Sequence, residues 1–197
     1  MRLTPTLAAS LLAAIITSGT PAVAAGNCSD PSGFPEWLES FKSQAAAQGI
    51  SQRAISAALD DVTYDRNTVS HDRGQRVFHQ SFEQFSGRMV NGYRIKKGAS
   101  LVRQYANVFS RIEREYGVQA PVLVSIWGLE TDFGANIGNF STIRSLATLA
   151  YDCRRSEMFR AELMDALRIV ERGDLNPATM HGAWAGEIGQ TQFMPSS

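Results

Sequence analysis

The sequence predicts an all-α domain, and three observations lead to this fold class. Apolar residues recur at three- and four-residue steps in several segments, which is the spacing of one helix face. Glycines, prolines and small polar residues of the kind that begin and end helices stand between these segments. No run alternates apolar and polar residues as a half-buried strand does, and no internal repeat occurs.

Two helices are predicted in the first third of the chain. Residues 35–48 form the first, which Gly49 can end, and Ser51 is a candidate cap for the second. Residues 60–74 are polar and carry turn-forming residues, so we expect a loop there. The inward-facing residues of the two helices are Trp37, Leu38 and Phe41, then Ile55, Ala58 and Leu59.

Two further apolar patterns occupy the middle of the chain. Residues 77–85 have near-helical spacing, for which core packing is the default interpretation and sugar stacking the alternative. A longer helix, residues 99–116, follows Gly98 and ends at Gly117. The residues that define these faces are Val77, Phe78, Phe82 and Phe85, then Leu101, Tyr105, Val108, Phe109 and Ile112.

Residues 120–134 predict a short helix of unusual composition. Pro121 suits the first helical position, where its missing N–H costs nothing, and Gly134 suits the left-handed stop. Apolar residues surround the axis instead of forming one stripe, so we expect this helix to be buried on most sides. They are Val122, Leu123, Val124, Ile126, Trp127, Leu129 and Phe133.

Glu130 lies near the end of this helix and is the candidate general acid. Ile126 and Trp127 precede it by four and three residues, so they share its face. Neighbours of this kind exclude water from a carboxyl, which raises its pKa and favours the protonated form that a general acid needs. The alternative is a solvated surface glutamate at a helix end.

Two helices are predicted after residue 140. Ser141 or Thr142 can cap the first, and Ser156 the second, which has Glu157 in its first turn and Gly173 as its stop. The expected buried residues are Leu146, Leu149 and Tyr151, then Phe159, Leu163, Leu167 and Val170.

The chain opens with the order of a secretory signal peptide. Arg2 precedes an apolar run over residues 7–16, and small residues end in Ala-Val-Ala-Ala at residues 22–25. The apolar run is too short to span a bilayer. We therefore predict a signal peptide over residues 1–25 and a soluble, exported, periplasmic protein with no integral membrane segment after cleavage. A buried N-terminal helix is the alternative.

The two cysteines, Cys28 and Cys153, allow one disulfide in an exported chain. A disulfide that closes so long a loop raises the free energy of unfolding by on the order of 4–5 kcal/mol in the chain-entropy model. Two unrelated thiols are the alternative. A lipid anchor on Cys28 is disfavoured because Asn27 precedes it, where a lipoprotein signal needs a small residue. Neither cysteine has His or Cys neighbours, so no metal site is predicted.

Charge and motif content exclude several functional classes. The chain has 19 Lys and Arg against 19 Asp and Glu, so no basic field favours nucleic acid, and a neutral or mixed polymer is allowed as partner. The histidines, His71, His79 and His181, form no His-Glu-x-x-His pair, and no Gly-x-Ser-x-Gly elbow occurs. We predict no metal ion and no cofactor.

Residues 182–197 are rich in glycine and neutral amides. Gln190, Thr191 and Gln192 offer donors and acceptors of the kind that recognise sugar hydroxyls, while the phosphate-loop patterns are absent. A glycine-rich connector is the alternative. The chain stops after this segment without a closing element, so we expect a fragment of a longer protein.

A second carboxylate is not evident from the sequence. Glycosidases of the usual kind use two carboxylates that flank the bond. Asp132 lies two positions after Glu130, which places it about 200° away around a helix. Glu187 is a better candidate, although a structural or solvated role is its simpler interpretation. A single candidate acid, Glu130, without an evident second carboxylate favours a mechanism that needs only one carboxylate.

From about Phe34 to its last residue, the chain resembles the B-type lytic murein transglycosylases. The resemblance is carried, in order, by Trp127-Gly128-Leu129-Glu130-Thr131, Phe133-Gly134, Gly138-Asn139-Phe140, Leu146-Ala147-Thr148-Leu149-Ala150-Tyr151, Arg154-Arg155 and Gly186-Glu187-Ile188-Gly189-Gln190-Thr191-Gln192-Phe193-Met194-Pro195-Ser196. It implies that residues 26–197 are the N-terminal part of a lysozyme-like catalytic domain, truncated at its C-terminus, whose cleft binds peptidoglycan glycan strands.

The resemblance also implies a mechanism with one glutamate. Glu130 matches the residue that first protonates the glycosidic oxygen between N-acetylmuramic acid and N-acetylglucosamine. It then takes the proton of the C6 hydroxyl, which attacks C1 of the same muramoyl residue. The product is a 1,6-anhydromuramoyl end formed without water, and the muramoyl N-acetyl group stabilises the intermediate.

Other site residues carry over from the same resemblance. Gln192 matches a glutamine that contacts the saccharide, and Arg154 and Arg155 match a basic pair suited to muramoyl or peptide carboxylates, with a solvated pair as the alternative. Phe193 and Met194 would line the cleft wall.

The chain departs from the family at two positions. Ala183 stands where members commonly have a serine that orients the glutamate, and Met158 stands near where some have a tyrosine. The alternative functions are a non-catalytic peptidoglycan-binding or scaffold protein on the same fold and a true hydrolase that uses Glu187.

Overall fold

The structure is a computed structural model of the 197-residue chain and describes residues 30–74 and 80–197. The predicted signal peptide lies outside these residues, as do Cys28, Val77, Phe78 and His79. The predictions for these residues, including a Cys28–Cys153 disulfide, therefore remain untested.

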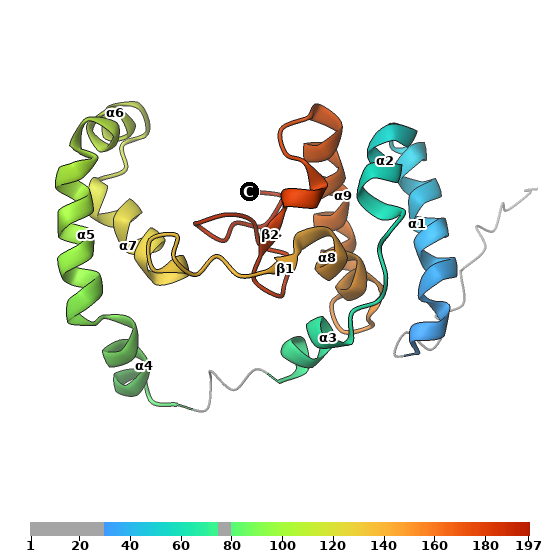
Figure 1. Ribbon diagram of the computed structural model, residues 1–197, viewed down its shortest axis with the longest axis horizontal. Coiled ribbons are helices and arrows are strands. Elements are labelled where there is room, and N and C mark those ends of the chain that lie inside the picture. Colours follow the sequence, from blue (N-terminus) through green and yellow to red (C-terminus); the bar gives the residue numbers. More distant parts are fainter. Residues whose placement is uncertain (1–29, 75–79) are drawn as a thin grey trace, which may run out of the picture.

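The described chain is helical, as predicted, with one short two-stranded sheet (Figure 1). The α-helices are α1 (Phe34–Ala47), α2 (Gln52–Leu59), α3 (Arg66–Arg73), α4 (Phe82–Met89), α5 (Gly92–Gln104), α6 (Ala106–Tyr116), α7 (Ala120–Thr131), α8 (Thr142–Tyr151) and α9 (Ser156–Arg172). Single 3-10 turns cover Pro31–Gly33 and Pro177–Thr179. Strand β1 (Phe140–Ser141) pairs with β2 (His181–Gly182) in antiparallel register.

Helices α1, α2, α8 and α9 form what we call the core bundle. Helix α9 packs along α8, and both α1 and α2 pack against this pair. The predicted apolar faces of these helices are buried in one continuous cluster. Its largest fully buried members are Phe159, Ile55, Leu59, Ile143, Leu146, Leu149, Leu163, Leu167 and Met180. Periodicity predicted the buried faces of α1, α2 and α9, whereas α8 is buried on all sides except at Arg144.

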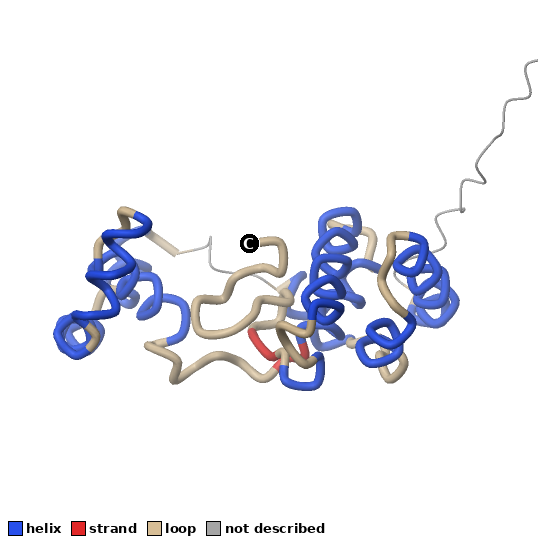
Figure 2. Tube along the Cα trace, turned by 90° about the horizontal axis from the view of Figure 1, so that it is seen from above, coloured by secondary structure: helices blue, strands red, loops and turns tan. Residues whose placement is uncertain are grey.

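Helices α4 to α7 form a second group, which we call the helical arm. The arm lies on the opposite side of the molecule from the core bundle, and the two groups remain separate when viewed from above (Figures 1 and 2). Helix α5 packs along α7, and α6 contacts both. The buried residues of the arm helices are only Gly98, Leu101, Val124, Gly128 and Thr131.

The prediction of a loop for residues 60–74 is wrong for the second half of this range, which forms α3. Asp65 caps this helix by accepting the N–H of Asn67. Its buried residues are Thr68, Val69 and Asp72, of which two are polar, so no apolar stripe marked it in the sequence. The Thr68 hydroxyl bonds Asp65 at 2.8 Å and lies 3.3 Å from the Ser145 hydroxyl. Polar contacts therefore replace apolar burial here.

The single helix predicted for residues 99–116 is two helices. The break falls at Tyr105, which is the C-cap of α5 and the N-cap of α6. Gly98 lies inside α5 and is not its start; a Cβ there would lie 3.1 Å from Val124, so glycine permits the close α5–α7 packing. Gly117 ends α6 in the left-handed conformation, as predicted.

Two smaller expectations also need correction. Arg155, not Ser156, is the N-cap of α9, and it makes no side-chain capping hydrogen bond. Phe82 was expected in the core but is 76% exposed at the start of α4. In the part of the chain that the structure describes, no helix has the length and apolar content to cross a membrane.

Candidate active site

Helix α7 carries Glu130 and ends three residues earlier than predicted. Asp132, Phe133 and Gly134 follow the helix with φ of 49°, 63° and 85°, so the left-handed turn begins at Asp132 and not at Gly134. Gly134 is still required, because a Cβ on it would lie 2.5 Å from the side-chain oxygen of Gln190. The sharp turn directs the chain from the arm toward β1.

Glu130 itself is exposed, so the prediction that its neighbours exclude water from it is wrong. The buried face of α7 consists of Val124, Gly128 and Thr131. Ile126 and Leu129 lie on the other side, 37% and 40% exposed. The predicted burial on most sides is therefore also wrong, since the contacts of α7 with α5, α6 and Gln190 leave Ile126 and Leu129 exposed.

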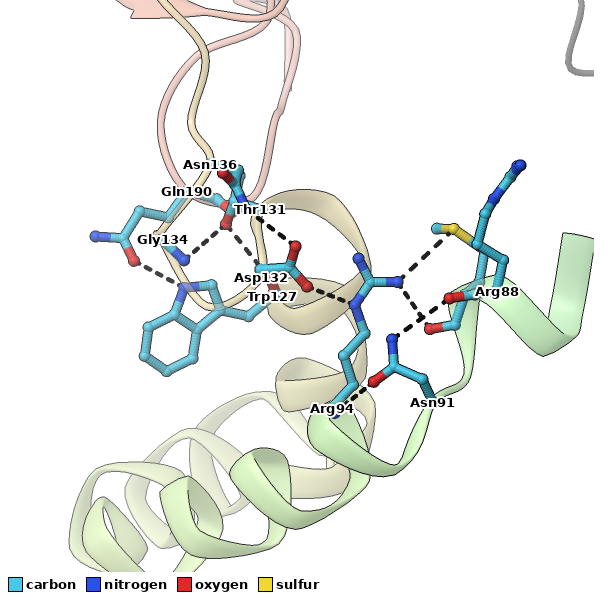
Figure 3. Close-up of polar contacts among 10 residues, drawn as sticks. Arg88, Asn91, Arg94, Trp127, Thr131, Asp132, Gly134, Asn136 and Gln190 are labelled. Atoms are coloured by element: carbon cyan, nitrogen blue, oxygen red, sulfur yellow. Dashed lines mark hydrogen bonds and ion pairs between the residues drawn. The ribbon is translucent and has the colours of Figure 1, made fainter.

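One side of the α7 terminus is held by a charged contact from α5. Arg94 Nε donates to Asp132 Oδ1 at 2.6 Å, and Arg94 Nη1 donates to the Met89 carbonyl at 2.7 Å (Figure 3). Asn136 Nδ2 donates to Asp132 Oδ2 at 3.0 Å. The Arg94 guanidinium holds the pKa of Asp132 below its ordinary value. The Asp132 carboxylate therefore holds the turn after α7 to α5 and to Asn136.

The other side of the α7 terminus is held by the glycine-rich segment. Trp127 Nε1 donates to Gln190 Oε1 at 2.7 Å, and the buried Thr131 hydroxyl donates to the Gln190 carbonyl at 2.6 Å (Figure 3). The N–H of Gly134 donates to the Thr131 hydroxyl at 2.9 Å. Residues more than 50 positions apart are thus joined at the residue that follows Glu130.

The side chain of Gln192 is engaged within its own loop. Its Oε1 accepts the N–H of Ala183 at 3.0 Å, and its Nε2 donates to the carbonyls of Ile137 and Gly189 at 3.0 and 2.6 Å. Both amide hydrogens are used, and Oε1 keeps one lone pair for another donor. The residue adopts a φ of 51°, which these three contacts compensate. Gln192 therefore joins the loop after α7, at Ile137, to two points of the glycine-rich segment, Ala183 and Gly189.

Glu187 is the acid of this region whose pKa is raised. Its half-buried position raises the pKa first, and the N–H groups of Glu187 and Ala185 oppose that shift. The negative charge of Glu130 raises the pKa further, and the Arg155 guanidinium lowers it. Glu130 and Arg155 therefore each lie within electrostatic reach of Glu187, although the three residues come from α7, the start of α9 and the glycine-rich segment.

Arg154 and Arg155 are not a freely solvated pair. Both donate to the carboxylate of Asp72 in α3, and the Arg155 guanidinium also lies 5.0 Å from the ring centre of Phe159. The sequence analysis missed Asp72, because it belongs to a polar segment taken as a loop. No local pattern distinguishes it, since its partners lie 82 and 83 residues later.

Three of the remaining predicted positions lie in the glycine-rich segment, and the fourth, Met158, lies in α9. Phe193 is 55% exposed, and its backbone forms a bridge with Ile188. The side chain of Met194 packs on the core bundle. Ala183 contributes only its N–H to Gln192. Met158 is exposed on α9.

A polar cavity of about 450 Å³ lies beside this region, between α3 and the two strands, and does not include Glu130. It is lined by Asp65, Asn67, His71, Asn139, Phe140, Ser141, Arg144 and His181. Within the described ranges, no group of three or more His, Cys, Asp or Glu residues is placed to hold a metal ion.

Comparisons with known proteins identify relatives of this arrangement. The sequence profile of the family described as Transglycosylase SLT domain matches residues 33–197. Membrane-bound lytic murein transglycosylase B of Escherichia coli strain K12 is 35% identical over 104 residues, which are 52% of this chain and 29% of that protein.

Solved structures agree with this comparison. SltB3 from Pseudomonas aeruginosa, in complex with NAG-NAM-pentapeptide, is 37% identical with a TM-score of 0.79, covering 83% of this chain and 44% of that one. The soluble lytic transglycosylase SltB1 from the same organism is 29% identical with a TM-score of 0.73, covering 81% and 55%. The chain thus spans about half the length of these structures and less than a third of the curated relative.

Proposed function

Because the chain belongs to the transglycosylase SLT domain family, we propose that it cleaves the β-1,4 bond between N-acetylmuramic acid and N-acetylglucosamine in peptidoglycan. The products are 1,6-anhydromuramoyl ends, and the role is turnover or remodelling of the cell wall. The predicted resemblance to B-type lytic murein transglycosylases, and with it the lysozyme-like fold class, is confirmed.

The single observation that carries the proposal is the position of Glu130 between two sets of polar contacts. Arg94 and Asp132 fasten one side of the α7 terminus, while Thr131 and Gln190 fasten the other. A general acid needs a fixed approach to its substrate, and these contacts supply it without covering the carboxyl. SltB3 has been solved with NAG-NAM-pentapeptide and with NAG-anhNAM-pentapeptide, which are the substrate and product types of this reaction.

In the proposed reaction Glu130 acts twice. Its carboxyl gives a proton to the glycosidic oxygen as the bond from that oxygen to C1 breaks, and the N-acetyl oxygen stabilises the electron-poor C1. The C6 hydroxyl oxygen then bonds to C1, and its proton returns to Glu130, so no water is consumed. Since Glu130 is exposed in the free chain, the bound saccharide must itself exclude water from the carboxyl.

The surrounding residues have separate proposed tasks. Arg154 and Arg155 bind carboxylates of the glycan strand, and the exposed ring of Phe193 stacks on a sugar face. Gln190 and Gln192 hold the glycine-rich segment in place, and the free lone pair of Gln192 Oε1 contacts a saccharide hydroxyl. The partner is the peptidoglycan glycan strand, and the location is periplasmic after export.

The test is mass spectrometry of purified peptidoglycan after digestion with the chain and with Glu130→Gln. We expect anhydromuramoyl products from the chain and a loss of rate of about 10²–10⁴-fold in the variant, the usual contribution of a general acid–base residue. Glu115→Gln, which changes an exposed glutamate on α6, is the matched control and should retain full activity. Cleavage by Glu130→Gln at the original rate would refute the assignment.

Two other outcomes would point to different functions. Reducing ends in place of anhydro ends would indicate hydrolysis, with Glu187 as the second carboxyl, because it lies within electrostatic reach of Glu130. Sedimentation with peptidoglycan but no cleavage products would indicate a non-catalytic binding or scaffold protein.

A further inference from the structure

Asp72 is the most enclosed charged group near the proposed site. Its side chain is 3% exposed at the end of α3. Arg154 donates to it through two nitrogens, Nε to Oδ2 at 2.8 Å and Nη2 to Oδ1 at 3.0 Å. Arg155 Nη2 donates to Oδ1 as well. A buried carboxylate is costly without such partners, so Asp72 and the two arginines form one unit.

This unit has an excess of one positive charge. Two guanidinium groups meet a single carboxylate, and their side chains are still 51% and 37% exposed. Arg154 spends two of its three nitrogens on Asp72, whereas Arg155 spends one. Arg155 Nε is buried without a hydrogen-bond partner, so the remaining terminal N–H groups and the excess charge are what a second carboxylate can use, and a carboxylate is the ligand that a guanidinium fork binds best.

The unit is linked to Glu130 through Glu187. The positive charge of Arg155 acts on Glu187, and Glu187 in turn is close enough to Glu130 to be affected by its negative charge. A carboxylate held by the arginines would therefore lie on the side of the proposed site where Glu187 lies. Asp72 itself is enclosed by its two partners and has no exposed edge for the substrate.

We propose that Asp72 is a positioning residue that orients Arg154 and Arg155 as one carboxylate-binding site for the glycan strand. The inference rests on the proposed function and deepens it, because it names the group that sets the geometry of the arginine pair. The carboxylate belongs either to the lactyl group of a muramoyl residue without peptide or to the peptide stem.

A neighbouring ion pair provides a matched control. Arg73, the next residue of α3, donates to Asp152 at 2.6 Å, and this pair joins α3 to the chain just before Arg154. It links the same two segments as Asp72 does but touches neither guanidinium group of the pair. Asp152 also accepts the N–H of Arg154, so Arg73→Gln weakens the same junction while both guanidinium groups keep their contacts with Asp72.

The experiment measures dissociation constants for three ligands in the Glu130→Gln background, so that binding is read without turnover. The ligands are glycan strands with peptide stems, strands whose stems an amidase has removed, and chitotetraose, which carries no carboxylate. We expect Asp72→Asn to weaken binding of a carboxylate-bearing strand by about 10- to 100-fold, the value of a charged hydrogen bond. Chitotetraose binding should be unchanged, and Asp72→Glu should restore part of the loss.

The outcomes separate the sources and the competing explanations. A loss confined to stem-bearing strands assigns the carboxylate to the peptide, and a loss confined to stripped strands assigns it to the lactyl group. Equal losses for all three ligands, or losses in Arg73→Gln as large as those in Asp72→Asn, would overturn the proposal in favour of a structural role. Unchanged binding in a folded Asp72→Asn would overturn it as well.

Two further measurements keep the result interpretable. If Asp72→Asn does not fold, Asp72→Glu keeps the charge but displaces the arginines, and unaltered binding by that variant would refute the positioning role. Kinetics with Glu130 intact should show a raised KM and an almost unchanged kcat for Asp72→Asn. If the chain cleaves nothing, the proposed function fails, while the dissociation constants still decide the role of Asp72.

Discussion

The core bundle and the helical arm are built by different means. In the core bundle, α9 buries a continuous stripe through Phe159, Leu163 and Leu167. In the arm, α4 and α6 have no buried residues, and α7 leaves one apolar side exposed. Most large exposed apolar residues of the described chain belong to the arm or flank its helices: Phe82, Val90, Tyr93, Ile95, Tyr105, Val108, Tyr116, Val122, Ile126 and Leu129.

The difference shows how the proposed catalytic glutamate is held in place. Glu130 belongs to the arm, but polar contacts with α5 and with the glycine-rich segment, more than apolar packing, orient the end of its helix. Hydrogen bonds with defined angles orient a terminus better than apolar burial does, because the hydrophobic effect has no direction. Stability and positioning are therefore assigned to different regions.

The largest contrast should appear when an apolar side chain is removed from each region. Leu163→Ala in α9 should lower the free energy of unfolding by about 2–5 kcal/mol, because it leaves a cavity in a fully buried site. Ile126→Ala on α7 should cost less, under about 1 kcal/mol, since this side chain is 37% exposed and its removal leaves no enclosed cavity. Urea titration measures both. Equal losses would mean that the arm contributes a core of its own.

A smaller effect should follow from breaking the polar attachment of α7. Thr131→Val removes the buried hydroxyl that donates to the Gln190 carbonyl and accepts from the Gly134 N–H, so both hydrogen bonds are lost. We expect a loss of about 1–3 kcal/mol and a lower rate of peptidoglycan cleavage. Ser125→Ala, on the exposed side of the same helix, removes only a bond to its own turn and serves as control. Full activity in Thr131→Val would separate the attachment from catalysis.

The charged attachment of the arm should weaken in acid. The folded-state pKa of Asp132 is lowered from 3.8, chiefly by Arg94, so the ionised carboxylate stabilises the folded chain above that pH. This stability is lost as the pH falls through the lowered pKa. The Asp132→Asn variant should therefore unfold at a lower temperature than the unsubstituted chain at pH 6, and this difference should shrink below pH 3.8. A deficit independent of pH would show that charge is not its cause.

The stability effect of replacing Glu187 should have the opposite pH dependence to that of Asp132, and it should be the smallest of these effects. Burial raises its folded-state pKa above 4.5, so the folded chain loses stability as the pH rises through that raised value. Glu187→Gln removes this loss and should unfold at a higher temperature than the unsubstituted chain at pH 7. The two should converge below pH 4.5. A variant that is less stable at every pH would show that the hydrogen bond from Ala185 outweighs the cost of burial.

Local patterns in the sequence were sufficient for the helices that bury one stripe. The apolar faces of α1, α2, α8 and α9, the left-handed glycines at 117 and 173 and the position of Glu130 near the end of its helix were all predicted correctly. Each depends on residues within a few turns of one another. The separate motifs that carry the family resemblance were equally readable, because they are strings of adjacent residues.

The tertiary structure alone decided what depends on distant partners. It made residues 66–73 a helix, left Glu130 exposed and paired Asp72 with two arginines of another segment. It also engaged Gln190 and Gln192 in contacts within the protein. The physical reason is that periodicity reports which face of a helix is apolar, whereas the burial of a charge depends on compensating groups that no local pattern identifies.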